Sequence, residues 1–283
     1  MTTTAPPAPH PAPSSPSRRA RQLLSCARQG AVVALADFRV FYTWRTWLGG
    51  WLVRLLCQTL FYALLAGMTD DTGDSGYVGY VVVGAAVMIG TTEALLTTAS
   101  TTWDTHTGTM PLLVASPAPP GFYYLGRSVQ WPLSGVVTCS VALLGLSPLF
   151  GVAWEPWQLP AAVALVALCT FGTYSLALAV GVLALLAPSA RNVLGTLVVM
   201  AVTAFCGAMI PVSHWPFAVR AVIWCVPTTH GLEAVRQLLD GSPGALWREI
   251  GLTLAATTGW TAIALTGFHL VFSRARRGGS LLV

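Results

Sequence analysis

Long apolar runs dominate the chain and determine its predicted architecture. A helix needs about 20 predominantly apolar residues to cross a hydrocarbon core about 30 Å thick. Six segments meet this requirement: Leu48 to Met68, Tyr77 to Ser100, Trp131 to Val152, Leu159 to Leu186, Val193 to Val212 and Ile250 to Phe272. Strands of a membrane barrel would alternate with a period of two, whereas residues 161–168 are apolar throughout. The pattern predicts an all-α polytopic membrane protein with six transmembrane helices over residues 48–272.

Composition supports a membrane environment and argues against two other classes of protein. Of the 283 residues, 54% are hydrophobic and only 9% are charged, whereas about 25% are charged in a typical soluble domain. All 15 basic residues are arginines, and a P-loop cannot form without its lysine. The arginines occur singly or in short groups, so we expect no nucleic acid partner. The chain should therefore hydrolyse no nucleotide through a P-loop of its own.

The six cysteines are Cys26, Cys57, Cys139, Cys169, Cys206 and Cys225. None forms a Cys-x-x-Cys motif and none has a histidine at metal-binding spacing, so we expect no metal or redox site. Cysteines within apolar runs behave as small hydrophobic residues.

The distribution of arginines predicts the orientation in the membrane. Loops on the cytoplasmic side carry an excess of basic residues. If the N-terminus is inside, the inner segments carry Arg18, Arg19, Arg21, Arg28, Arg39, Arg45, Arg127, Arg191, Arg274, Arg276 and Arg277. The outer segments carry Arg220, Arg236 and Arg248, together with Asp70, Asp71 and Asp74. We therefore expect both termini, including a tail over residues 273–283, to be cytoplasmic. The Arg-, Ala- and Pro-rich composition favours a bacterial cell membrane.

Two segments precede the first span. Residues 1–20 are rich in Pro, Ala, Thr and Ser and are expected to form a disordered tail because they cannot bury enough apolar surface. Residues 21–47 combine arginines with aromatic residues at helical spacing, which predicts an amphipathic elbow helix in the inner interface. Its aromatic and basic residues near the membrane are Phe38, Arg39, Phe41, Tyr42, Trp44 and Arg45. A plain juxtamembrane anchor is the alternative.

Arg54 and Glu93 are ionisable residues inside predicted spans, where each costs on the order of 2.5 to 3.5 kcal/mol. Arg54 lies seven residues past Trp47 and Glu93 lies seven before Ser100, so each is about 10 Å from the inner boundary at 1.5 Å rise per residue. We predict that they form an intramembrane pair between antiparallel helices. The pair would serve as a gate or as part of a substrate path, or it would be purely structural; alternatively, Arg54 extends to the headgroups by itself.

Two segments outside the spans carry recognisable patterns. The inner loop from Trp103 to Pro117 predicts a brief helix lying across the inner surface. On the outer side, residues 211–216 break the fifth span, and the apolar stretches 217–226 and 227–239 are too short to cross. They predict two short re-entrant helices, with Thr228 or Thr229 capping the second. In that second helix, Glu233 and Arg236 are expected to pair at i, i+3.

The order of these parts resembles the type-2 permease subunits of ABC exporters over residues 30–275. The family pattern Glu-Arg-x-x-Gly-Thr-Leu-Glu-x-Leu-Leu-x-x-Pro is matched by Asp104, Gly108, Thr109, Leu112, Leu113 and Pro117. The pattern Asn-Pro-Leu-Thr-Tyr-x-x-Glu-x-x-Arg is matched by Pro227, Thr229, His230, Glu233 and Arg236. The sequence departs from these patterns at His106, Met110, Pro111 and Val226.

This resemblance implies a transport subunit, not an enzyme. Two permeases, as a homodimer or with a sister permease, would work with two copies of an ATP-binding cassette ATPase. This chain would bind no cofactor, and ATP and Mg would be bound by the ATPase. The resemblance places the ATPase-coupling surface at Asp104, His106, Thr107, Gly108, Thr109, Leu112 and Leu113. It places an outer gate at Pro227, Thr229, His230, Glu233 and Arg236.

The apolar spans favour a small amphiphilic substrate such as a drug, an antibiotic or a natural product, and export of a glycan or a lipid-linked polymer is the alternative. A proton-coupled carrier would need several membrane carboxylates or histidines, and the sequence offers only Glu93 and a peripheral His269. An intramembrane enzyme would need a nucleophile beside a base. Ser134 lacks the flanking glycine of a serine-hydrolase motif, and His230 lies beside Thr229 with no orienting acid except Glu233. We expect these residues to serve in packing or capping.

Overall fold

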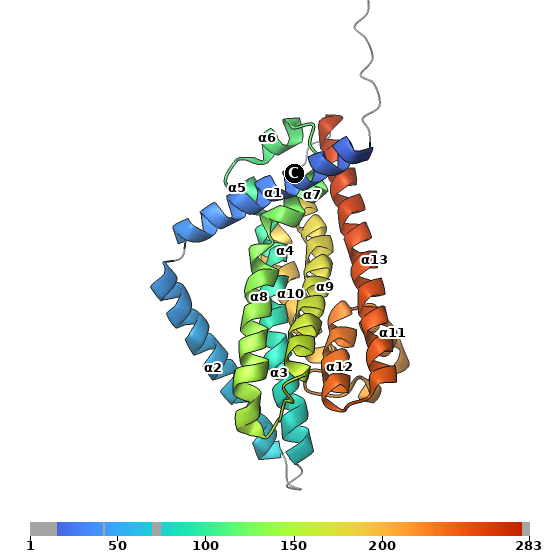
Figure 1. The fold of residues 1–283 in the computed structure, drawn as a ribbon. Coiled ribbons are helices and arrows are strands. Elements are labelled where there is room, and N and C mark those ends of the chain that lie inside the picture. Colours follow the sequence, from blue (N-terminus) through green and yellow to red (C-terminus); the bar gives the residue numbers. More distant parts are fainter. Residues whose placement is uncertain (1–15, 42, 70–74, 279–283) are drawn as a thin grey trace, which may run out of the picture.

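A computed structural model describes residues 16–41, 43–69 and 75–278, and all of its regular elements are helical. Figure 1 shows a bundle of long helices, with α1 (Pro16–Phe41) lying across one end. The last helix, α13 (Pro243–Arg276), finishes at this same end, which we call the α1 end. The opposite end contains α12 (Pro227–Leu239) and is called the α12 end.

The remaining helices run between these ends or turn at them. In the first half of the chain they are α2 (Trp44–Thr69), α3 (Ser75–Leu95), α4 (Thr97–Ser100), α5 (Trp103–His106), α6 (Met110–Ala115), α7 (Pro120–Arg127) and α8 (Gln130–Ser140), followed by a π-helical turn (Val141–Leu146) and a 3₁₀ turn (Ser147–Phe150). In the second half they are α9 (Gln158–Leu186), a 3₁₀ turn (Pro188–Ala190), α10 (Arg191–Phe205), a 3₁₀ turn (Val212–His214) and α11 (Phe217–Ile223).

Within the described residues, five helical stretches are long and apolar enough to cross a membrane. They are Gly76–His106, Pro120–Phe150, Gln158–Leu186, Pro188–Phe205 and Pro243–Arg276. These stretches overlap five of the six predicted spans, and they indicate a multi-pass membrane protein. The remaining predicted span lies in α2, which is not among the five. The six-span topology and the side on which the termini lie therefore remain predictions.

Several helix boundaries differ from the sequence expectation. The crosswise helix begins at Pro16 and ends at Phe41, and Trp44 and Arg45 belong to α2. The fifth predicted span ends at Phe205, not at Val212, because Gly207 adopts a positive φ of 85° and interrupts the helix.

Other expectations fall partly outside the described residues. These are the tail over residues 1–15, Tyr42, the acidic residues Asp70, Asp71 and Asp74, and residues 279–283. The side chains of Arg18, Arg19 and Phe41 are also outside the described part.

The helix α3 forms the centre of the bundle and is buried along most of its length from Val81 to Leu95. This explains its apolar character on all sides. It packs closely against α8, because a Cβ atom added to Gly90 would lie 2.3 Å from the carbonyl oxygen of Gly135. Small residues allow membrane helices to pack at such short distances. A second core at the α1 end stacks Tyr124 of α7 on Phe268 of α13, with ring centroids 4.7 Å apart.

Candidate functional site

One arginine joins three elements at the α1 end. Arg127, at the end of α7, binds Asp37 of α1 at 2.5 Å and Asp104 of α5 at 3.5 Å. Arg127 and Asp104 are both buried, whereas Asp37 is partly exposed. A buried guanidinium is stable only where carboxylates or other acceptors compensate for its lost hydration. The α1 end is therefore held together as one unit by this ion-pair network.

Asp104 also shapes the turn between α5 and α6. Its backbone carbonyl accepts a hydrogen bond from the backbone NH of Thr109 at 3.0 Å, and its carboxylate accepts one from the Thr109 hydroxyl at 3.3 Å. Gly108 completes the turn with a φ of 71°, a conformation that favours glycine. Only 3% of Asp104 is exposed, so the expectation that it lies on the coupling surface is wrong. It supports that surface from below.

The other residues predicted for coupling lie at or near the surface. His106, Thr107, Gly108 and Thr109 are exposed, Leu112 is 72% exposed, and Leu113 is half-buried against the second core. Figure 1 shows α5 and α6 at the α1 end, close to α1.

Arg276 of α13 fixes the far end of α6. It donates hydrogen bonds to the backbone carbonyls of Val114, Ser116 and Ala118 at 3.0, 2.6 and 3.1 Å. These hydrogen bonds connect the C-terminal end of α6 to α13.

Arg54 and Glu93 are brought together, as predicted from their equal depth. Arg54 donates a hydrogen bond to Oε1 of Glu93, and Thr138 of α8 is placed to donate a second at 2.9 Å. Trp51 donates to the hydroxyl of Thr138 at 2.5 Å. The pair thus connects α2, α3 and α8. Sequence reasoning missed Thr138 and Trp51, because no local signal connects a threonine or an indole to a carboxylate more than 40 residues away.

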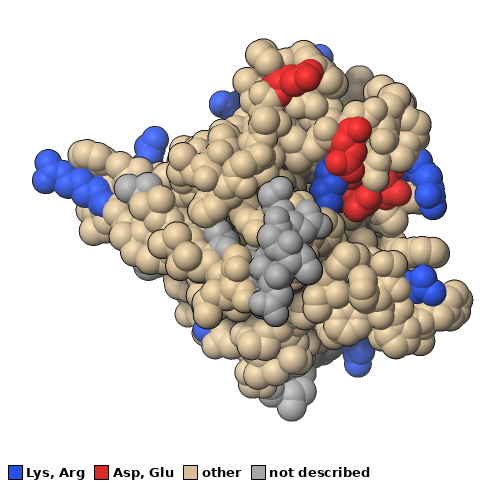
Figure 2. Space-filling view, turned by 90° about the horizontal axis from the view of Figure 1, so that it is seen from below, with Lys and Arg blue, Asp and Glu red and all other residues tan. Residues whose placement is uncertain are grey.

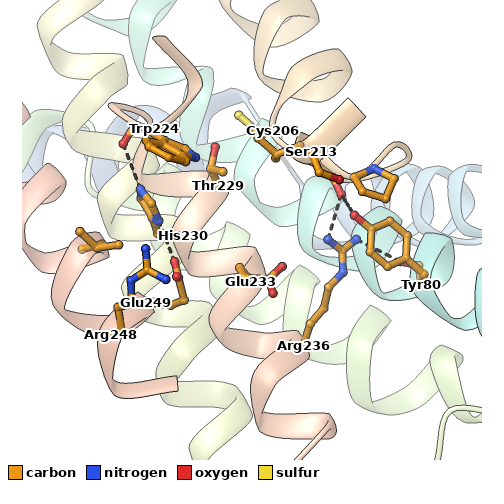
Figure 3. Close-up of a pocket in the computed structure, with 14 residues that line it drawn as sticks. Tyr80, Cys206, Ser213, Trp224, Thr229, His230, Glu233, Arg236, Arg248 and Glu249 are labelled. Atoms are coloured by element: carbon orange, nitrogen blue, oxygen red, sulfur yellow. Dashed lines mark hydrogen bonds and ion pairs between the residues drawn. The ribbon is translucent and has the colours of Figure 1, made fainter. Parts of the chain in front are cut away.

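Four of the five predicted gate residues line a cavity of about 630 Å³ at the α12 end, namely Thr229, His230, Glu233 and Arg236. The fifth, Pro227, packs against Gly172 of α9 instead. Charged residues of both signs line the cavity: Glu233 and Arg236 from α12, and Arg248 and Glu249 from α13. Figure 3 shows these side chains around the cavity, with Tyr80 of α3 opposite α12. Viewed from this end, Figure 2 shows acidic and basic side chains side by side on a largely uncharged face. The cavity is therefore a charged site on an otherwise largely uncharged face of the molecule.

Arg236 crosses from α12 to α3 and to the break after α10. It donates hydrogen bonds to the carbonyls of Gly207, Ala208 and Tyr80 at 2.9, 3.2 and 3.2 Å. Its guanidinium lies over the ring of Tyr80, 3.4 Å from the centroid, in a cation–π contact. Burial lowers the pKa of the Arg236 side chain from its ordinary value, an effect that Tyr80 and Glu233 oppose. The positive charge is thus stabilised mainly by dipoles and a π-system.

The predicted ion pair between Glu233 and Arg236 is absent from the ion pairs of the described residues. Glu233 accepts a hydrogen bond from Gln237, one turn later, at 2.7 Å. Arg236 is directed into the bundle, where carbonyl groups satisfy most of its donors. The i, i+3 spacing would allow an ion pair between Glu233 and Arg236. Arg236 instead donates to backbone carbonyls of neighbouring elements.

Capping of α12 also differs from the expectation. The N-cap is Val226, without a side-chain cap, and Pro227 occupies the first turn. The hydroxyl of Thr228 bonds to that of Thr173 at 2.7 Å, and the hydroxyl of Thr229 donates to the carbonyl of Ile223 at 3.1 Å. The two threonines therefore bond α12 to α9 and to α11, and neither caps the helix.

His230 links α12 to α13 and to the end of α11. Its Nδ1 lies 2.7 Å from the Glu249 carboxylate, and its Nε2 lies 3.0 Å from the carbonyl oxygen of Trp224. Both ring nitrogens are therefore engaged. Glu249 was not anticipated, because it precedes the predicted start of the last span at Ile250.

Comparison with known proteins agrees with this arrangement. The family model for ABC-2 type transporters matches residues 30–239, about three quarters of the chain. The match includes α5, α6 and α12 and ends before α13. No curated protein matches the chain. The matched region contains the α5–α6 surface and the part of the polar cavity that α3 and α12 contribute, whereas Arg248 and Glu249 of α13 lie beyond it. This chain therefore belongs to the ABC-2 type transporter family and is a multi-pass membrane permease.

Proposed function

We propose that this permease is the membrane subunit of an ATP-driven exporter in the bacterial cell membrane. It would act with a second permease, as a homodimer by default, and with two copies of a separate ABC ATPase that bind ATP and Mg. The observation that carries this proposal is the construction of the α1 end. An exposed helix, α6, presents Leu112 outward, while Arg127 and Arg276 connect its surroundings to α1, α7 and α13.

This construction supports a mechanism of mechanical coupling. Closure of the ATPases around ATP would displace α5 and α6. The ion pairs of Arg127 would carry the displacement to α1 and α7, and the hydrogen bonds of Arg276 would carry it to α13. A ligand or nucleotide can shift an equilibrium only by binding one state better than another. The permease pair would accordingly exchange inward and outward access.

The apolar character of the spans favours an amphiphilic drug, antibiotic or natural product as the substrate. Export of a glycan or lipid-linked polymer is the second candidate. A proton-coupled carrier is disfavoured because Glu93 is paired with Arg54. An intramembrane enzyme is disfavoured because His230 has a carboxylate and a carbonyl, not a nucleophile, as its partners.

Co-purification tests the proposal. The tagged chain should bring down an ATPase carrying a Walker motif in equal amount, and export should require ATP and persist when the proton gradient is collapsed. Leu112→Asp should abolish ATPase binding by placing a charge on the apolar contact. The matched control is Leu149→Asp, because Leu149 is 75% exposed but follows α8 toward the α12 end. ATPase binding by both variants, or transport by the chain alone, would contradict the proposal.

A further inference from the structure

Several buried polar atoms near the α1 end have no hydrogen-bond partner among the described residues. Three of them are Oε2 of Glu93, Oε1 of Gln130 and Nε1 of Trp131. Two others, Nε of Arg127 and Oδ2 of Asp104, belong to the ion pair already described. A buried polar group without a partner is destabilising. The free atoms of Glu93 and Gln130 are both acceptors, so a group with several donors would satisfy them.

The three residues surround two adjoining cavities. Glu93 and Trp131 line a cavity of about 200 Å³, and Gln130 and Trp131 line one of about 320 Å³. Phe38 and Trp131 belong to both linings. Ligand pockets for small molecules have volumes of about 300 to 1,000 Å³, so the two cavities together offer space for one head group.

Aromatic rings form much of the wall. Trp47 and Trp51 of α2 line the first cavity and stack at 5.7 Å, and Phe38 of α1 meets Trp47 edge-on at 6.2 Å. Trp131 separates the two cavities. Tryptophan faces attract cations, most strongly where water is excluded. The wall therefore favours a positively charged group over a neutral or negative one.

Charged groups of both signs line the cavities. The carboxylates are on Asp37 and Glu93 and the guanidinium groups are on Arg54 and Arg127, so the lining charges balance. Arg54 is 42% exposed, whereas the side chain of Glu93 is 5% exposed. The arginine of this pair is therefore the better solvated partner, and the buried carboxylate of Glu93 has more to gain from a further donor.

We propose that these two cavities form a binding groove for the ammonium head of an amphiphile, which deepens the proposed function by naming a substrate class. A primary ammonium has three donors. It donates to Glu93, whose carboxylate turns readily about its terminal bond, and to Gln130, while the indole of Trp131 covers its charge. The tail lies along the outward face of α2, where Val53, Leu56 and Leu60 are exposed. Figure 1 shows that α2 stands at the margin of the bundle.

Binding to the purified full chain in maltoside detergent tests the groove without any ATPase. The probes are dodecylamine, which is cationic at neutral pH, and the neutral dodecanol, and the signal is tryptophan fluorescence. The wild-type chain should bind dodecylamine at least about tenfold more tightly, because a hydrogen bond to a charged group contributes about 1.5 to 3 kcal/mol. Equal affinity for the two probes would overturn the proposal, whatever the variants show.

Variants locate the site. Glu93→Gln should remove most of the preference for dodecylamine and leave dodecanol binding unchanged, and Gln130→Met should reduce the preference several-fold. Glu155→Gln is the matched control, since Glu155 lies on an exposed loop before α9. If the Glu93→Gln variant does not fold, the preference of the Gln130→Met variant for dodecylamine over dodecanol tests the assignment. Unchanged selectivity in the folded Glu93 or Gln130 variant would overturn the assignment.

Competition distinguishes two sources of the ammonium group. Displacement of dodecylamine by added phosphatidylethanolamine would show that a bilayer lipid occupies the groove, and resistance to displacement would assign it to exported cargo. Either result supports an ammonium site. The test is independent of the proposed function, because failure to bind dodecylamine leaves ATPase co-purification intact, and failure of co-purification leaves dodecylamine binding intact.

Discussion

At the scale of single residues, replacing Arg127 should destabilise the fold strongly, because Arg127 is the counter-ion of two carboxylates, those of Asp37 and Asp104. Arg127→Met should leave Asp104 buried without its counter-ion and release Asp37 of α1. Removing one partner of a buried ion pair costs about 3 to 5 kcal/mol, so thermal unfolding in detergent should occur at a clearly lower temperature. Arg274→Met is the control, since Arg274 is exposed at the same end. Identical unfolding temperatures for the two variants would show that the network contributes nothing.

Residue-level interactions were only partly predictable from the sequence, and the difference has a physical cause. Arg54 and Glu93 could be paired because an unsolvated charge needs a partner and their depths agree. The contacts of Arg236 could not be predicted, since its acceptors are carbonyl groups exposed where α10 is interrupted at Gly207. Asp104 was misplaced for a similar reason. Its burial depends on Arg127, more than 20 residues later, and not on the polar sequence around it.

At the scale of elements, apolar length predicted the helices well, but it could not predict how they break. The segment from Val193 to Val212 reads as a continuous span, yet α10 ends at Phe205. Hydropathy does not distinguish a helical apolar residue from one in a bend, and only Gly207 and Pro211 signal the change. The crosswise helix α1 was predicted from its mixture of arginines and aromatic residues. The packing of α1 against α7 was not predicted from the sequence, because this contact depends on close backbone approaches at Gly30 and Gly126.

A glycine contact between α1 and α7 gives a prediction at this scale. A Cβ atom added to Gly126 would lie 1.8 Å from the carbonyl oxygen of Ala27, so Gly126→Ala should push α1 away from α7. Overpacking of this kind costs about 1 to 3 kcal/mol. Trypsin should then cut faster at the exposed Arg28 and Arg39 of α1. The control is Gly259→Ala in α13, where no atom lies within 4 Å; equal digestion of both variants would contradict close packing as the cause.

At the scale of the whole molecule, the two ends of the bundle have different construction. The α1 end is held by arginines that bind carboxylates and helix-end carbonyls, whereas the α12 end encloses a polar cavity between α3, α12 and α13. The family match covers elements at both ends. The orientation of these two ends in the membrane decides which of them a cytoplasmic ATPase would reach.

Cysteine labelling determines this orientation. Cys225 is exposed between α11 and α12, whereas Cys26 lies on α1 at the opposite end and is half-buried. Because arginines concentrate toward the α1 end, we expect that end to be cytoplasmic. In variants with a single cysteine, a membrane-impermeant maleimide should label Cys225 in intact cells and Cys26 only after permeabilisation. Leu112→Cys, placed on exposed α6 in a chain lacking the other cysteines, should behave like Cys26 but react faster. Labelling of Cys26 or of Leu112→Cys in intact cells would reverse the orientation and remove α6 from the reach of any cytoplasmic ATPase.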